Sequence, residues 1–250
     1  MELSKIDLPR KYEYKEGESR QEYQKYNGWN KVSYSQITSF LSDDYKGDYF
    51  AGYFMGIRDG GNIFSYFGSA CGDYLNKQDQ RIDEYLSKED KETLDSIERP
   101  DNAVYEYEIL INLEPFGLEK TVLQGFSDIQ YEVAHKVLNV HDYKTLNLDK
   151  KKDFYESDDY QQLNTYGYGL EELGFSINKT SVFGLGRQGN TTDTTAYSKV
   201  GNPLWLRLSG IVEEIDRPYN REEAEKYIYK IAETCKKISE YKRVYEKYFK

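Results

Sequence analysis

Two neighbouring segments near the middle of the chain alternate between hydrophobic and polar residues, and this period of two is typical of β-strands. In the first segment Phe126 and Asp128 share one face. In the second, residues 137–145, Asp142 and Lys144 share a face. Only a short connection separates the segments, which favours an antiparallel hairpin with the two carboxylates close together.

Three further segments carry strand patterns. Residues 104–113 alternate so that Glu106 and Glu108 fall on one side, and this side faces either the two aspartates or solvent. Residues 180–187 and 204–208 are two more predicted strands, joined by a polar loop rich in Thr and Gly into a long hairpin.

Apolar residues at spacings of three and four predict several helices. Ser33 precedes one such run as an N-cap. Residues 67–75 carry an amphipathic stripe, and residues 78–101 form an acidic stretch that we interpret as a surface helix promoting solubility. Two later helices are expected, one starting at Ser157–Asp159 with Gly174 as its C-cap and one spanning Arg221–Phe249.

Strands and helices together predict one α/β domain, a mixed central sheet flanked by helices. We expect the 250 residues to form a single unit, with 1–30 as an N-terminal arm, 31–215 as the core and 216–250 as a C-terminal helix packed back on the sheet.

Asp128, Asp142 and Lys144 form a chemically coherent set. Mg²⁺ takes oxygen ligands and usually keeps several waters, so one or two carboxylates suffice to anchor it. Such an ion activates water and neutralises charge on a phosphoryl oxygen. A lysine beside it is able to orient the water or hold the phosphate. These residue types therefore indicate phosphodiester hydrolysis.

The same residues carry a resemblance to a known family. A Gly-x-x-Asp motif ends at Asp128, an Asp-Tyr-Lys-Thr motif begins at Asp142, and a Gln-Leu-x-x-Tyr motif runs from Gln162 to Tyr166. This order resembles the RecB-type branch of the PD-(D/E)XK nuclease superfamily. The resemblance implies a restriction-endonuclease-like core and an exonuclease that uses Mg²⁺ or Mn²⁺ on DNA ends in recombination or repair.

The resemblance also implies roles for single residues. Asp128 and Asp142 would bind the metal, and Lys144 would act on the water or the developing charge. Gln162 and Tyr166 would support the site or the substrate, while the alternative makes Tyr166 an ordinary core residue.

The chain departs from the family in its first motif, Gly-x-x-x-His-x-x-Leu-Glu. Gly72 stands at the position of the metal-binding His, and Asn76 at that of the Glu. Asp73, one residue along, either supplies the missing oxygen ligand or is an ordinary solvated helix residue. The angular offset of about 100° between helical neighbours means that it is not a direct replacement.

The charge distribution bears on a DNA partner. The net charge of −10 disfavours a protein that binds phosphates, but it is unevenly spread. Residues 83–108 hold ten acidic and three basic side chains, and residues 217–250 hold ten basic and six acidic ones. Residues 150–152 are three lysines, placed either to meet a phosphate backbone or in a solvated loop. Together with Lys144 and the C-terminal helix they predict a basic groove.

The chain has two cysteines, Cys71 and Cys235, so it cannot hold the four-cysteine iron–sulfur cluster of some RecB-type nucleases. No signal peptide or membrane-spanning run is visible, and we expect a cytoplasmic protein.

The second functional hypothesis is a catalytically decayed nuclease fold that binds nucleic acid or protein. The acidic charge and the missing first-motif His favour it, whereas the complete Asp128, Asp142 and Lys144 set opposes it.

Overall fold

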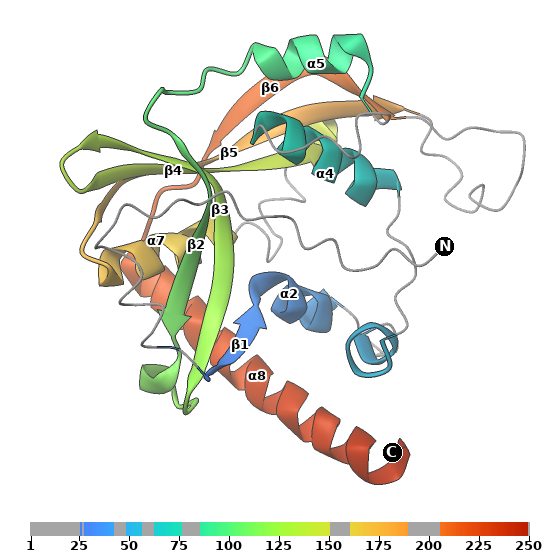
Figure 1. Ribbon diagram of the computed structural model, residues 1–250, viewed down its shortest axis with the longest axis vertical. Coiled ribbons are helices and arrows are strands. Elements are labelled where there is room, and N and C mark those ends of the chain that lie inside the picture. The colour runs from blue at the N-terminus through green and yellow to red at the C-terminus, as the bar shows by residue number, and fades with distance from the viewer. Residues whose placement is uncertain are drawn as a thin grey trace, which may run out of the picture.

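The computed structural model describes residues 26, 28–42, 49–56, 63–76, 86–150, 161–189 and 206–249 of the chain. At its centre is a six-stranded sheet of order β1-β3-β4-β5-β6, in which β2 also pairs with β3 (Figure 1). The strands are β1 (Asn30–Ser33), β2 (Val104–Asn112), β3 (Thr121–Ala134), β4 (Val137–Leu146), β5 (Ser176–Gly189) and β6 (Leu206–Asp216).

The sheet is mixed, as the sequence predicts. β3 runs antiparallel to β2 and β4, and β5 runs antiparallel to β6. The pairs β1–β3 and β4–β5 are parallel. Parallel neighbours need a crossover connection, and α7 (Gln162–Glu172) lies in the connection from β4 to β5.

Helices cover both sides of the sheet. In Figure 1, α4 crosses in front of the strands, and α7 and α8 pass behind them. One buried cluster joins α2, α7 and α8 to the strands, and a second joins α4 and α5 to them. The remaining helices and helical turns are α2 (Tyr34–Ser42), η1 (Phe50–Phe54), α4 (Ile63–Leu75), α5 (Lys88–Asp95), η3 (Glu114–Phe116), η4 (Leu148–Lys150) and α8 (Arg221–Phe249).

The predicted helix ends are confirmed where the structure describes them. The Ser33 hydroxyl accepts a hydrogen bond of 3.1 Å from the Gln36 N–H and so caps α2. Gly174 follows α7 with φ of +86°, and the N–H groups of Gly174 and Phe175 bond back to carbonyls of the last turn. Only glycine adopts this conformation without strain.

Three features differ from the sequence predictions. The short strand β1 was not predicted, and β6 continues to Asp216, well beyond the predicted end at Leu208. The acidic stretch contains the short helix α5, and its Asp90 is buried. The Asp90 carboxylate accepts a hydrogen bond of 2.6 Å from the Leu208 N–H, so this helix secures β6 rather than serving solubility alone.

Several predictions fall outside the described residues. These are the N-terminal arm up to residue 25, the helix start at 157–159, the lysines 151 and 152 and most of the loop between β5 and β6. None of the described helices combines the length and the apolar character that crossing a membrane requires.

Candidate active site

The site lies where β3 and β4 separate. The two strands pair as far as Ile129 and His141, after which β4 continues along β5 alone. Asp128 and Asp142 are the next residues on each strand. The Asp128 carboxylate accepts a hydrogen bond of 2.7 Å from the Tyr143 N–H. At this fork, the point where the two strands diverge, a side-chain hydrogen bond therefore replaces the backbone hydrogen bonds between them. The two aspartates therefore lie on neighbouring strands, as predicted.

Asp142 and Lys144 form an ion pair on β4. The Lys144 Nζ lies 2.7 Å from Asp142 Oδ2, and the Asp142 side chain is 3% exposed whereas that of Lys144 is 30% exposed. Lys144 also donates a longer hydrogen bond of 3.4 Å to Gln162 Oε1. The Lys144 side chain thus contacts both β4 and α7 and stays partly exposed.

Helix α7 supports this arrangement through Tyr166. Its hydroxyl accepts hydrogen bonds from Gln162 Nε2 at 2.7 Å and from the Phe126 N–H at 3.2 Å. Gly125 permits this approach, because a Cβ there would collide with the Tyr166 ring. Tyr166 is a buried residue of the core, and it also bonds to Gln162, which accepts the hydrogen bond from Lys144.

Four carboxyl groups influence one another at the fork. Burial, together with the neighbouring Asp142, raises the pKa of Asp128 well above its usual range. Burial and then Asp142 and Asp73 raise the pKa of Glu106 to about 7. Burial also raises the pKa of Asp73. Carboxylates held together in this way favour a proton or a cation nearby.

Two residues near this cluster were not assigned to it from the sequence. The sequence left open whether Glu106 on β2 faces the site or solvent. Asn76 stood out only as a departure from the first motif. Asn76 Nδ2 donates a hydrogen bond of 2.6 Å to Glu106 Oε1. The sequence held one clue to Glu106. Because Asn76 stands where the resembled first motif has a Glu, another residue had to be sought as the acid.

The carboxylate oxygens of the site are suitable ligands for a hydrated cation. Across the described ranges no three His, Cys, Asp or Glu side chains are already gathered as a cage for an ion. Mg²⁺ is usually bound through one or two carboxylates and keeps several waters, so a complete cage is not required. Burial and the neighbouring carboxylates raise the pKa values of Asp128 and Glu106, and a positive charge close to them would offset this repulsion.

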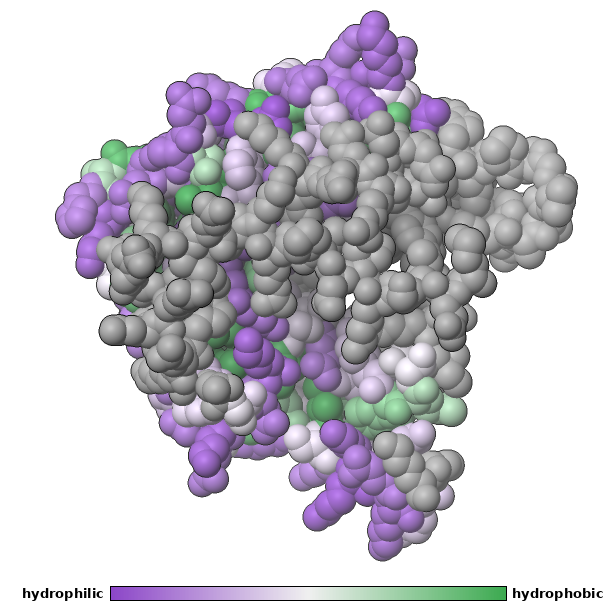
Figure 2. All heavy atoms as spheres, viewed as in Figure 1, coloured by the Kyte–Doolittle hydropathy of each residue, from purple (hydrophilic) through white to green (hydrophobic). Residues whose placement is uncertain are grey.

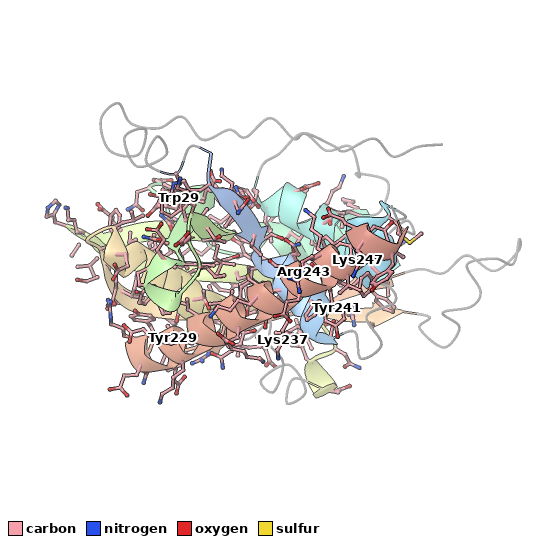
Figure 3. The ribbon with its side chains drawn as sticks, turned by 90° about the horizontal axis from the view of Figure 1, so that it is seen from below. Trp29, Tyr229, Lys237, Tyr241, Arg243 and Lys247 are labelled. Atoms are coloured by element: carbon pink, nitrogen blue, oxygen red, sulfur yellow. The ribbon has the colours of Figure 1, made fainter. Side chains whose placement is uncertain are left out.

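The C-terminal half of α8 offers a second surface. Residues 236–248 carry five basic and two acidic side chains. Tyr241 and Tyr248 are 42% and 67% exposed there. Figure 3 shows Lys237, Tyr241, Arg243 and Lys247 along this part of the helix, and Figure 2 shows its end as a largely hydrophilic projection.

Comparisons with known proteins bear on the fold. No protein-family model and no curated protein matches the chain. Among solved structures, a protein of Eubacterium rectale described as "putative exonuclease" aligns with 88% of this chain and 85% of its own, with a TM-score of 0.53 and 16% sequence identity. At this identity the match shows a shared fold. The chain therefore has a nuclease-like α/β fold with a central mixed sheet flanked by helices.

Proposed function

We propose that this protein is a metal-dependent nuclease of the RecB type that hydrolyses phosphodiester bonds in DNA, acting as an exonuclease at DNA ends. One observation carries the proposal. The strand fork brings together Asp128, the Asp142–Lys144 pair and the Gln162–Tyr166 pair, the three motifs that the sequence analysis singled out. End preference, and a place in recombination or repair, rest on the family resemblance, with the exonuclease description of the E. rectale protein in support.

In this mechanism Asp128 and Asp142 would hold Mg²⁺ or Mn²⁺, with Asp73 as a candidate further ligand. The ion would supply a more acidic water and positive charge at the scissile phosphate. Lys144 contacts Asp142 and Gln162, and from this position its ammonium would hold a phosphate oxygen or orient the attacking water. Tyr166 keeps Gln162 in place and stays protonated, because burial and Asp142 raise its pKa.

The C-terminal half of α8 is the proposed DNA contact. Lysine and arginine side chains neutralise phosphates, and exposed tyrosines provide faces on which unpaired bases stack. This local positive charge offers a way for a chain of net charge −10 to bind DNA.

The test is cleavage of linear and circular DNA by the purified protein with Mg²⁺, Mn²⁺ or EDTA. Asp142→Asn and Lys144→Ala should both remove most turnover, and only Asp142→Asn should also weaken metal binding, since an ammonium is not a ligand. Lys88→Ala, an exposed lysine of α5, is the control and should cleave like the parent.

Melting temperatures of the same variants separate a catalytic role from a structural one. Breaking a fully buried ion pair costs about 3–5 kcal/mol. Lys144 is partly solvated, and removing Asp142 relieves its repulsion with Asp128 and Glu106, so Asp142→Asn should lose much less stability. Strong destabilisation, together with a parent that shows no metal-dependent cleavage, would refute the nuclease proposal.

A second candidate function is a decayed nuclease fold that binds nucleic acid or protein without cleaving it. Gly72 at the position of the first-motif His, and the lack of a ready-made ligand cage in the described residues, favour it. Tight DNA binding that is indifferent to EDTA, with no cleavage in Mg²⁺ or Mn²⁺, would select this function.

A further inference from the structure

Glu106 has an unusual backbone conformation for a strand residue. The β2–β3 register passes from Tyr105–Ile129 to Tyr107–Ser127, so Glu106 lies across from Asp128. Its φ is +51°, in the left-handed region that residues with a side chain rarely adopt. The other described non-glycine residues with positive φ, Lys120 and Lys136, precede or connect strands and lie in turns.

A left-handed conformation is strained for a residue that carries a side chain, so the surrounding structure must hold Glu106 in it. Asn76 provides one contact that does so. It follows the last residue of α4, and its side-chain amide holds the Glu106 carboxylate at 2.6 Å. Arg99 Nη1 donates to the Leu75 carbonyl at 3.1 Å and so fixes the end of the helix that carries Asn76. The end of α4 and the strained backbone of β2 together fix the orientation of the Glu106 carboxylate.

Asn76 has a second feature that points to a ligand. The residue is 9% exposed, and its Oδ1 has no hydrogen-bond partner within the described part of the chain. A buried amide oxygen without a partner is costly in a native structure. Amide oxygens are also among the ligands of hard divalent cations, so this atom is suited to face a bound ion or its water.

Asp73 lacks such support. Its carboxylate makes no hydrogen bond or ion pair with any described residue, although it lies near enough to Glu106 to raise the pKa of that group. Of the two acids on this side of the fork, Glu106 is the one that the fold holds in a fixed orientation.

We propose that Glu106, positioned by Asn76, is the further acid of the cation site formed by Asp128 and Asp142, in place of Asp73, and that it holds a water of the hydrated ion. The inference rests on the proposed function and deepens it. In this arrangement β2 supplies the acid, and Asn76, directly after α4, orients it.

Mn²⁺ binding tests this directly, measured by calorimetry and by the paramagnetic resonance spectrum of the bound ion. Glu106→Gln should weaken Mn²⁺ binding by at least about tenfold, which corresponds to about 1.4 kcal/mol. Asp73→Asn should change it by less than about threefold. Glu108→Gln is the matched control, because Glu108 is a buried glutamate of the same strand whose partners include Gln124 and Lys31. It should bind Mn²⁺ like the parent.

A double variant guards against loss of the fold. In Asn76→Asp/Glu106→Gln the hydrogen bond is kept with its direction reversed, and the carboxylate moves from β2 to α4. This variant should recover most of the Mn²⁺ affinity that Glu106→Gln loses, because the same region again holds an anionic oxygen.

The outcomes separate this inference from the function it rests on. If the parent binds Mn²⁺, Asp142→Asn weakens binding and Glu106→Gln does not, Glu106 takes no part in the cation site and the inference is wrong while the nuclease proposal stands. If the parent neither binds Mn²⁺ nor cleaves DNA, the proposed function itself fails.

Discussion

Gly125 is the residue on which the packing of the site depends most directly. The Tyr166 ring lies against its backbone, in the space that any side chain at position 125 would fill. Tyr166 in turn binds Gln162, which accepts the hydrogen bond from Lys144. A methyl group at position 125 would therefore act on Lys144 through two intervening side chains.

Gly125→Ala should destabilise the protein by roughly 1–3 kcal/mol, the usual cost of overpacking, and lower cleavage by displacing Tyr166. Gly72→Ala is the contrasting variant, because a Cβ there meets open space on the surface of α4 and alanine favours a helix by up to about 1 kcal/mol. Chemical denaturation of both variants measures these changes. Equal stability of the two would show that Tyr166 moves aside without cost.

At the scale of elements, separation of β3 from β4 creates the site. Between Gln124, which pairs with β1, and Ile129, which pairs with β4, no described strand covers this edge of β3. There the Phe126 N–H donates to the Tyr166 hydroxyl, and the Asp128 carboxylate accepts a hydrogen bond from the Tyr143 N–H of β4. Polar side-chain groups therefore take the place of backbone pairing where the two strands separate.

Helix α8 divides into two parts. Its first half packs into the core through Ala224, Ile228 and Ile231, whereas most side chains of residues 239–248 are exposed. Lys237 and Tyr241 are four residues apart, as are Arg243 and Lys247, so each pair shares a side of the helix. One side of this half therefore combines a lysine with an aromatic ring, and another side carries two basic residues.

Replacing Lys237, Arg243 and Lys247 with alanine should weaken binding of single-stranded DNA and lower its dependence on salt. Each lost phosphate contact should reduce the slope of log affinity against log salt by about 0.7. Lys226→Ala, in the first half of the helix, is the control and should leave the slope unchanged. Fluorescence anisotropy across a salt series measures both. An unchanged slope in the triple variant would remove α8 from the DNA-binding surface.

At the scale of the whole molecule, stability should depend on pH through His141, which lies in the sheet with its ring turned away from Asp142. Its side chain is buried, with Nδ1 2.5 Å from the Ser181 hydroxyl and Nε2 3.3 Å from that of Tyr131. Burial lowers the pKa of His141 to about 4, partly opposed by Glu214. The folded protein therefore keeps this ring neutral at pH values where an unfolded chain would protonate it.

The sign follows from linkage. Between the ordinary histidine pKa of about 6.5 and the folded value, only the unfolded state gains a proton, so stability falls as the pH is lowered through this range. The loss is on the order of 3 kcal/mol at most. His141→Gln should flatten the stability profile between pH 6.5 and 4 relative to the parent, whereas His135→Gln, in the exposed β3–β4 turn, should not. If the parent, His141→Gln and His135→Gln showed the same dependence of stability on pH, this account would be wrong.

The sequence by itself determined the local elements and the chemistry that they carry. A period of two identified the hairpin of Asp128 and Asp142, and apolar stripes identified α4 and α8, because these patterns depend on side-chain spacing along one segment. The three motifs also gave the nuclease-like fold class that the structural match supports. The helix ends at Ser33 and Gly174 could be predicted from the sequence for the same reason, because each depends on hydrogen bonds within a few residues.

Tertiary structure alone decided which distant groups meet. β1 is four residues long, too short for a recognisable period, and it forms because β3 offers it an edge. Glu106 looked like any alternating strand residue, and its orientation depends on a left-handed backbone and on Asn76, thirty positions earlier in the chain. Strand alternation assigns a side chain to a face only while the backbone stays regular, so the residue that breaks the pattern had to be found in the fold.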